Sequence, residues 1–332
     1  MLFTRYMKLS FLLLLLLPCL APAQSRPTPQ QLAQPRGTSN ELPMFGGQPK
    51  TAEQLAADQQ FVATARRQHG PAREAAHVYV NFGWSYLQTG NPVVAIKRFN
   101  QAWLLDSTLA DVYYGFSAWQ QPRNPAEAER FRLLARRHDP DSQAMIQYYN
   151  SVAYGHSLHR EYAQALAANA QVLALEANNP FANGRAGFWY MQQQDTARAA
   201  HYLTRAVELN PQDSVSFLNR GWLRYEQKRY PAAIADFTAA ARINPHYINA
   251  YANRALAHAD AGNYAAAVAD NEQCLHLVQP RDRGQFYRAI GMLKLRLHDS
   301  AGACAALSQA LQWGDAPAAE REIRKLQKEH CR

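Results

Sequence analysis

The chain has 332 residues, of which 48% are hydrophobic and 18% are charged. This composition is ordinary for a soluble chain that buries a core. The net charge is +9, but basic and acidic residues interleave along the whole sequence. A nucleic-acid-binding protein would gather its basic residues on one face, so the charge pattern argues against a nucleic-acid partner.

Residues 1–23 are typical of a secretory signal peptide. Arg5 and Lys8 precede a short apolar run, which is followed by an Ala-Pro-Ala site ending at Ala23. Cleavage there would export the mature protein to the periplasm or the extracellular space. Two alternatives keep the chain tethered to a membrane: an uncleaved anchor, for which the apolar run is short, or a lipid on Cys19, which the neighbouring Pro18 disfavours.

Residues 24–50 hold five prolines and three glycines and show no apolar period, so they predict a disordered linker. Their only apolar cluster is Leu42–Phe45, which either docks on the remainder of the chain or on a partner, or stays free; we expect it to stay free. An N-terminal capping helix is predicted over residues 51–75. It begins at Thr51, and Gln54 supplies the partner of a capping box.

A repeat of 34 residues is visible between residues 180 and 281. Segments beginning at Pro180, Ser214 and Ile248 align without a gap. One column of the alignment holds Gly187, Gly221 and Ala255, and another holds Ala199, Ala233 and Ala267. Each segment contains two stretches of helical periodicity separated by a turn. A single helical hairpin cannot bury its own apolar face, so neighbouring hairpins must stack. The repeat therefore predicts an all-α solenoid.

The repeat resembles the tetratricopeptide repeat family. The residues that carry the resemblance in segment 214–247 are Phe217, Gly221, Ala233, Phe237, Ala240 and Pro245. Extending the register implies seven repeats over residues 76–315. They would start near Ala76, Ala110, Ile146, Pro180, Ser214, Ile248 and Gly284. The twentieth position then reads Ala95, Ala128, Ala165, Ala199, Ala233, Ala267 and Ala303, and we expect this series to be buried.

Two departures from the family pattern stand out. The second repeat is one residue short near the turn 121–123. At the twenty-fourth position, where the family has an apolar ring, three repeats carry Arg132, Asn169 and Asn271. We expect those three repeats to pack less tightly.

The C-terminal residues 316–332 predict an amphipathic capping helix with Ile323 and Leu326 facing inward. It resembles the final helix of exported bacterial tetratricopeptide proteins that end near a cysteine. A Cys304–Cys331 disulfide would join the last repeat to this cap, the alternative being free buried thiols. Cys274 stands in a column of small residues and is expected in the core.

Sequence motifs for nucleotide binding, zinc hydrolysis, redox chemistry or a nucleophilic serine do not occur in the chain. We therefore predict no catalytic residue, no metal site and no cofactor. His156 and His159 have the spacing of two metal ligands on a helix but no third ligand near them in sequence, so surface histidines are expected. Pairs of opposite charge 16 residues apart, Arg220 with Asp236 and Arg254 with Asp270, suggest structural ion pairs.

The family resemblance places positions 2, 5, 9, 12 and 13 of each first helix on the concave groove. Aromatic residues at positions 5, 9 and 12 are the candidate peptide-binding residues: Trp84, Tyr114, Tyr154, Phe188, Trp222 and Tyr225. Asn219 and Asn253 fit a carboxylate-clamp pattern, but acidic and amide residues at position 13 do not.

The sequence thus predicts an exported, non-catalytic scaffold that binds a protein or peptide partner in the groove of the solenoid. The alternative is a component of a cell-envelope assembly or transport complex, either with or without a lipid anchor. Neither hypothesis involves nucleic acid or a small-molecule cofactor, and contact with a membrane would occur only through an N-terminal anchor.

Overall fold

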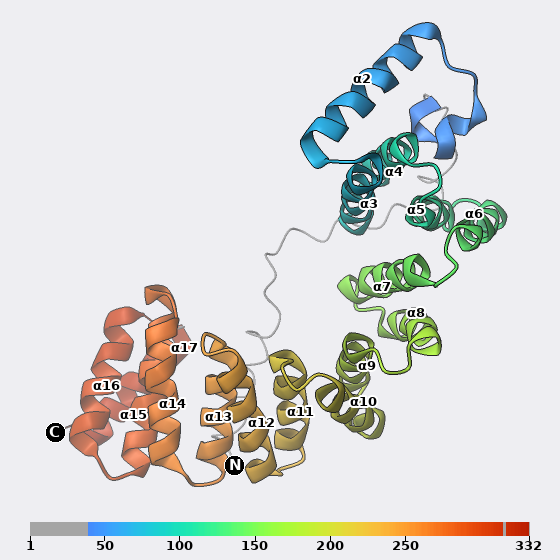
Figure 1. The fold of residues 1–332 in the computed structure, drawn as a ribbon. Coiled ribbons are helices and arrows are strands. Elements are labelled where there is room, and N and C mark those ends of the chain that lie inside the picture. The colour runs from blue at the N-terminus through green and yellow to red at the C-terminus, as the bar shows by residue number, and fades with distance from the viewer. Residues whose placement is uncertain (1–38, 315–316, 332) are drawn as a thin grey trace. The chain divides into compact units, whose positions relative to one another are not determined.

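The computed structural model describes residues 39–314 and 317–331. Within these ranges every regular element is a helix and no strand occurs (Figure 1). The predicted all-α architecture is therefore confirmed. No described helix combines the length and the apolar character needed to cross a membrane. The predicted signal peptide and Cys19 lie outside the described residues.

The chain forms two compact units, Met1–Ala177 and Asn178–Arg332, where the sequence alone suggested one array. The described part of the first unit contains η2 (Ser39–Glu41), η3 (Pro43–Gly47), α2 (Ala52–His69), α3 (Ala72–Gln88), α4 (Pro92–Leu105), α5 (Ala110–Gln120), α6 (Pro125–Arg137), α7 (Gln143–Leu158) and α8 (Tyr162–Leu175).

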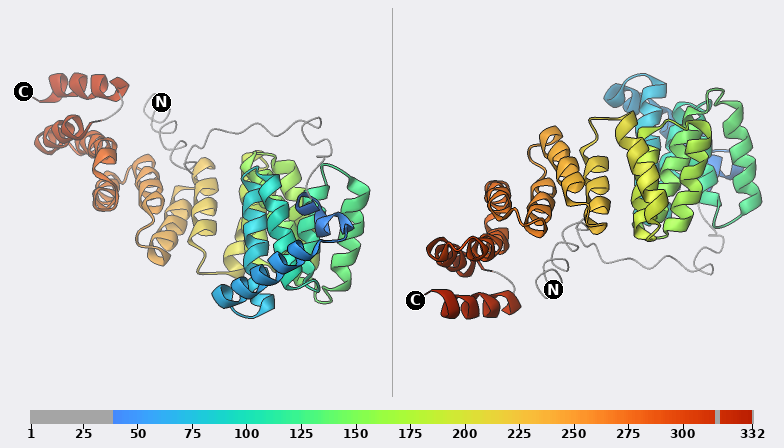
Figure 2. Two further views of the ribbon diagram at one scale, coloured as in Figure 1. Left: turned by 90° about the horizontal axis from the view of Figure 1, so that it is seen from above. Right: turned by 90° about the horizontal axis from the view of Figure 1, so that it is seen from below.

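The second unit is also built of helices that run in antiparallel pairs (Figure 2). Its elements are α9 (Pro180–Gln192), α10 (Thr196–Leu209), α11 (Ser214–Glu226), α12 (Tyr230–Ile243), α13 (Ile248–Asp260), α14 (Tyr264–Leu277), η4 (Pro280–Asp282), α15 (Arg283–Arg296), α16 (Ser300–Trp313) and α17 (Pro317–His330).

The helices from α3 to α16 pair into the seven hairpins that the repeat predicts, three in the first unit and four in the second. The helices α5, α9, α11 and α13 begin at the predicted residues. However, α3 begins at Ala72, directly after Pro71, so residues 72–75 belong to the first repeat and not to the capping helix. The cap itself is α2, whose first turn has the expected capping box of Thr51 and Gln54.

The repeat columns become the core. All seven alanines from Ala95 to Ala303 in the twentieth position are fully buried. Small residues of the eighth position face large residues of the second helix in the same hairpin: a Cβ placed on Gly221 would lie 2.7 Å from Cε1 of Phe237, and one on Gly187 would lie 2.5 Å from Cγ of Leu203. Small and large side chains therefore interlock, which sets how closely the two helices approach.

In six of the seven hairpins, the turn between the two helices contains one residue with positive φ; the turn 121–124 contains none. Glycine occupies this place in two hairpins, as Gly90 and Gly262, whereas Arg160, Gln194, Lys228 and His298 adopt the same left-handed conformation in the other four. A residue with a Cβ pays about 1 kcal/mol or more for that conformation. The stacking of the hairpins therefore offsets the free-energy cost of this backbone conformation, which the residues in these turns do not favour by themselves.

The second repeat finds its aromatic ring one residue earlier than the register predicts. Phe131 is buried and packs its ring 5.3 Å from that of Phe116, while Arg132 is partly exposed. In the other two repeats, Asn169 and Asn271 are buried at the ring position, and the Asn271 side-chain amide donates to the Ala267 carbonyl at 2.7 Å.

The prediction of a disordered linker is wrong for residues 39–50. The cluster Leu42–Phe45 docks on α4: the Asn100 Nδ2 donates to the Leu42 carbonyl at 2.9 Å, and Phe45 is buried beside Trp103 with ring centroids 6.4 Å apart. The Lys50 ammonium lies 3.2 Å from the centre of the Phe45 ring. The cluster therefore finds an apolar partner within its own chain, which composition alone does not reveal.

The C-terminal helix α17 closes the second unit as a cap. Ile323 is fully buried against Leu307 and Ala310 of α16, and Leu326 packs at the edge of the same cluster. Cys304 of α16 and Cys331 are joined by a disulfide, with Cα atoms 5.7 Å apart. Cys274 is free and buried, and burial raises the pKa of its thiol to about 12. This cysteine is therefore a packed, protonated side chain.

Reduction of the Cys304–Cys331 disulfide should loosen the cap specifically. The bond closes a loop of 27 residues, for which the loss of chain entropy in the unfolded state is worth about 3 kcal/mol. Hydrogen exchange should show faster exchange in α17 after treatment with reductant, while α9 to α13 stay protected. The Cys304→Ser variant should exchange like the reduced protein and should not respond to reductant. Equal exchange in α17 with and without the bond would show that helix packing alone holds the cap.

Candidate binding surfaces

Four of the six aromatic residues predicted to bind a peptide reach the surface. Tyr154 of α7 is 45% exposed, and Trp84, Phe188 and Trp222 are half-buried. Trp84 lies on α3, Phe188 on α9 and Trp222 on α11, so all four belong to first helices of hairpins. We call the surface formed by these first helices the A-helix surface, separately in each unit.

Tyr114 and Tyr225 do not belong to this surface, and their assignment as groove residues is wrong. They are only 1% and 2% exposed. The Tyr225 hydroxyl donates to Asp260 Oδ2 at 2.6 Å, which ties α11 to α13. The Tyr114 hydroxyl donates to Asp139 Oδ2 at 3.4 Å. Burial, together with the neighbouring carboxylate, raises the pKa of each hydroxyl, which keeps it a neutral donor. Tyr225 therefore joins two helices, and Tyr114 joins α5 to the segment between α6 and α7.

In the second unit, an exposed apolar strip runs over two neighbouring first helices. Phe181 is 63% exposed at the start of α9, and Val215 is 52% exposed at the equivalent place on α11. Phe188 and Trp222 follow them seven residues later, which is two helical turns and hence the same face. Because α9 and α11 contact each other, the four residues form one surface, which we call the apolar strip.

The family resemblance assigns position 2 of each repeat to the groove, whereas the six candidate residues occupy positions 5, 9 and 12. Phe181 and Val215 occupy position 2, and they are more exposed than any of the six named candidates. The signal was therefore present in the repeat register. The prediction omitted these residues because it considered aromatic side chains at positions 5, 9 and 12 and did not include position 2, where the strip has one aromatic and one aliphatic side chain.

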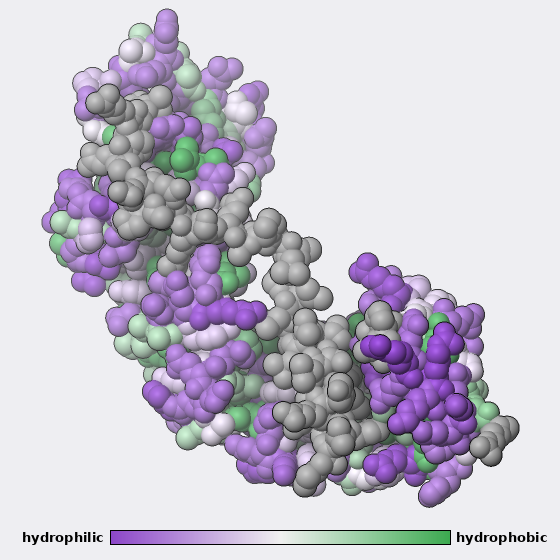
Figure 3. Space-filling model, turned by 180° about the vertical axis from the view of Figure 1, so that it is seen from behind, coloured by the Kyte–Doolittle hydropathy of each residue, from purple (hydrophilic) through white to green (hydrophobic). Residues whose placement is uncertain are grey.

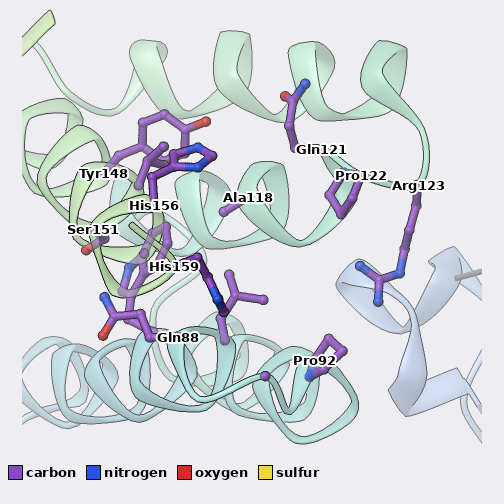
Figure 4. A pocket seen from close by; sticks show the side chains of 15 residues that line it. Gln88, Pro92, Ala118, Gln121, Pro122, Arg123, Tyr148, Ser151, His156 and His159 are labelled. Carbon is purple, nitrogen blue, oxygen red and sulfur yellow. The ribbon is translucent and has the colours of Figure 1, made fainter. Parts of the chain in front are cut away.

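The first unit contains a pocket of about 390 Å³ on its A-helix surface (Figure 4). Three first helices and the turns that follow α3 and α5 provide its walls. The residues that line it are Trp84, Leu87, Gln88, Gly90, Pro92, Ala118, Gln121, Pro122, Arg123, Tyr148, Ser151, Val152, Gly155, His156 and His159. Such a volume is within the range of ligand-binding pockets in proteins.

Aromatic contacts fix the apolar wall of the pocket. The Trp84 ring packs edge-on against Phe99 and Tyr148, with centroid distances of 5.7 and 6.1 Å. Tyr148 is in turn stacked on the buried Tyr114 at 5.1 Å. The pocket wall is therefore continuous with the core, and its shape is set before any ligand arrives.

His156 and His159, which have the spacing of metal ligands, both line this pocket. The Nδ1 of His156 lies 2.7 Å from Glu161 Oε2, and His159 is exposed. No group of three or more histidine, cysteine, aspartate or glutamate side chains able to hold a metal ion exists among residues 39–314 and 317–331. The two histidines are thus polar groups at the rim of an apolar pocket.

The charge pairs noted in the sequence join the two helices of one hairpin. The Arg220 guanidinium donates to both oxygens of Asp236 at 3.0 and 2.7 Å, and the Arg224 Nη1 adds a third bond of 2.7 Å. Arg254 makes the corresponding two bonds to Asp270, at 2.9 and 2.6 Å. Bidentate pairs inside a hairpin position helices, and they lie apart from the apolar strip.

The remaining surface is mixed. Figure 3 shows hydrophilic residues over most of the described part of one face, with smaller hydrophobic patches between them. Hydrophilic residues of this kind solvate a helical surface.

Comparisons with known proteins agree with the repeat. The tetratricopeptide repeat family model matches residues 189–248. No curated protein matches the sequence. Among solved structures, a crystal structure of MamA protein is 20% identical and has a TM-score of 0.47, with 51% of this chain and 91% of that chain covered. MamA residues 41-end from Desulfovibrio magneticus RS-1 is 17% identical, also with a TM-score of 0.47, and the coverage is 51% and 94%.

The matched residues 189–248 run from the end of α9 through α12. They include the interlocked pair Gly221 and Phe237, which recurs in three other hairpins as Gly83 with Phe99, Gly187 with Leu203 and Gly291 with Leu307. Residues 189–248 thus carry the tetratricopeptide repeat, and the hairpins on either side of them stack in the same manner.

Proposed function

We propose that this protein is a non-catalytic scaffold that binds a protein or peptide partner on its A-helix surface. The observation that carries the proposal is the apolar strip of Phe181, Phe188, Val215 and Trp222. Large apolar side chains grouped on one face of a folded protein mark interaction sites, and aromatic residues contribute most of the binding energy at such sites.

The helical framework supports this function energetically. Phe188 and Trp222 are half-buried, whereas Phe181 and Val215 are exposed at the starts of their helices. A surface whose backbone is held by stacked helices loses little conformational entropy when a partner docks. Little of the interaction free energy is therefore offset by ordering of the scaffold when the partner binds.

Photo-crosslinking tests the proposal in the cell. A photoreactive phenylalanine analogue at position 181 should give a discrete adduct of higher mass after irradiation, because this side chain is the most exposed of the apolar strip. The same analogue at position 297 is the matched control, since Leu297 is also exposed and apolar but lies at the end of α15, outside the strip. Loss of the adduct in the Val215→Asp variant would link it to the strip. No specific adduct from positions 181, 188 or 222 would refute the function.

The proposal includes export of the protein. The mature chain would be released into the periplasm or the extracellular space, and the alternative is that it stays tethered to a membrane. Both the release and the tether rest on the residues before Gln24 alone. Mass spectrometry of the mature protein should find an N-terminus at Gln24 for a cleaved signal. A lipid on Cys19 would instead favour the alternative hypothesis, a lipoprotein component of an envelope complex.

A further inference from the structure

The pocket of the first unit has an unbalanced charge. The side chains that line it include one guanidinium, from Arg123, and two imidazoles, from His156 and His159, but no carboxylate. Among the residues that the structure describes, Glu161 is the acidic group that contacts this set, through His156. The polar rim is therefore suited to a negatively charged group.

Arg123 supplies the permanent positive charge of the pocket. Its guanidinium lies 4.0 Å from the centre of the Trp119 ring, and its Nη1 donates to the Trp119 carbonyl at 2.5 Å. The Trp119 Nε1 donates to the Pro92 carbonyl at 2.9 Å, which fixes the ring. The guanidinium is half-buried, and burial lowers its pKa. Among the described residues it forms no ion pair with a carboxylate, so a partly desolvated cation is held in place without a counter-ion.

The rest of the pocket is apolar. Trp84, Leu87, Ala118 and Val152 contribute to its walls. Ala118 lies between Arg123 on one side and the histidines on the other (Figure 4). An occupant that matches both parts needs a large apolar group and an anionic group a few ångströms away. An occupant with only the apolar group would leave the Arg123 cation unpaired, and an occupant with only the anionic group would leave the apolar wall in contact with water.

We propose that this pocket receives one large apolar side chain of a partner polypeptide, and that Arg123 pairs with an aspartate or glutamate beside that side chain. The inference rests on the proposed function and names the chemistry of the partner for the first unit. Ala118 lies between the two sides of the pocket, so a side chain that enters there meets apolar atoms first.

A polypeptide is the occupant that fits the surroundings of the pocket. Tyr154 of α7 is 45% exposed and stands between the lining residues Ser151 and Gly155 in sequence. Tyr154 lies on the face of α7 next to the one that lines the pocket, so a polypeptide that places one side chain in the pocket is long enough to cover this ring as well. A free small molecule would leave this ring unused.

Selection from a random 12-residue peptide library on the folded protein tests the inference. We expect enriched peptides to contain an aromatic or large aliphatic residue with an acidic residue within two positions. In fluorescence anisotropy, synthetic copies should bind the Arg123→Gln variant at least ~10-fold more weakly, because one charge-assisted hydrogen bond is lost. Arg123→Lys should recover part of the loss. Arg137→Gln, which removes an exposed cation from the same unit, should bind like the parent protein.

Filling the pocket is the second arm. Ala118→Trp should abolish binding, and circular dichroism must show that the variant is folded. Gly155→Leu fills the pocket from α7 and is expected to fold, since a Cβ at Gly155 meets no atom within 4 Å. Peptides without the acidic and apolar pair, or equal binding by Arg123→Gln, would overturn the inference. Peptides that are blocked by Phe181→Asp and not by Gly155→Leu would overturn it while the proposed function stands. A library that yields no peptide also overturns it, and crosslinking at position 181 then decides the function separately.

Discussion

Replacing Asp236 by asparagine should lower the free energy of unfolding of the second unit by about 4 kcal/mol. The carboxylate is 3% exposed and accepts three hydrogen bonds from Arg220 and Arg224. The asparagine side chain has nearly the same shape but no charge, so two partly buried guanidinium groups lose their counter-ion. Removal of one partner from a buried ion pair costs about 3–5 kcal/mol, because the remaining charge is left unpaired in a medium of low polarity.

Urea unfolding of the parent and the Asp236→Asn protein, followed by circular dichroism, gives this difference directly. Asp195→Asn is the matched control, because Asp195 pairs with Arg198 in a more exposed place and asparagine still caps α10. Its midpoint should change little. If both variants shifted equally, the buried network would contribute no more than a surface pair.

The network also shows what sequence reasoning could and could not supply. The offset of 16 residues between arginine and aspartate indicated a contact between two helices, and the structure places that contact inside one hairpin. Arg224 as a second partner of Asp236 was not foreseen. It lies one helical turn after Arg220, on the same face of α11, and therefore reaches the same carboxylate.

The repeat predicted the fold well because each repeated position has one environment. The alanines from Ala95 to Ala303 are buried for the same reason in every hairpin, so seven weak signals added up. The binding surfaces have no such redundancy. The pocket in the first unit depends on Arg123, which lies in the turn between the two helices of the repeat that is one residue short. The sequence marked that turn as irregular but gave no reason to expect a ligand there.

The errors at Tyr114 and Tyr225 have a related cause. Position in a repeat predicts which side of the helix a residue occupies, but it does not say whether the adjacent helix offers a hydrogen-bond acceptor. Asp139 and Asp260 accept from these two hydroxyls and draw the rings into the core. A polar tip that finds a buried acceptor lets a tyrosine behave as a core residue.

Phe99→Ala should destabilise the first unit by about 4 kcal/mol, and it should reverse the effect of an alanine at Gly83. The Phe99 ring is fully buried between Gly83 of α3 and Gly115 of α5. Loss of a buried phenylalanine ring costs about 3–5 kcal/mol, since its contacts vanish and a cavity is left. In the parent protein, Gly83→Ala should itself be destabilising by about 1–3 kcal/mol, because the added methyl group overlaps the ring and a packed core resists expansion.

In the Phe99→Ala background, the same methyl group should enter the cavity. It then adds contacts and the better helix propensity of alanine, worth about 1 kcal/mol, so Gly83→Ala should become stabilising. Gly115→Ala should behave in the same way, since its Cβ would lie 2.5 Å from the ring. Gly155→Ala is the control: a Cβ there meets no atom within 4 Å, so it should be mildly stabilising in both backgrounds.

Urea unfolding of the four proteins in the Gly83 and Phe99 cycle measures the coupling between the two positions. A change of sign shows that the glycine exists to admit the ring, and that the close approach of α3, α4 and α5 follows from this pair. An equal cost for Gly83→Ala in both backgrounds would mean that the glycine serves the backbone and not the ring. The interlock of small and large residues would then fail as the explanation of the hairpin, although the helices themselves would remain.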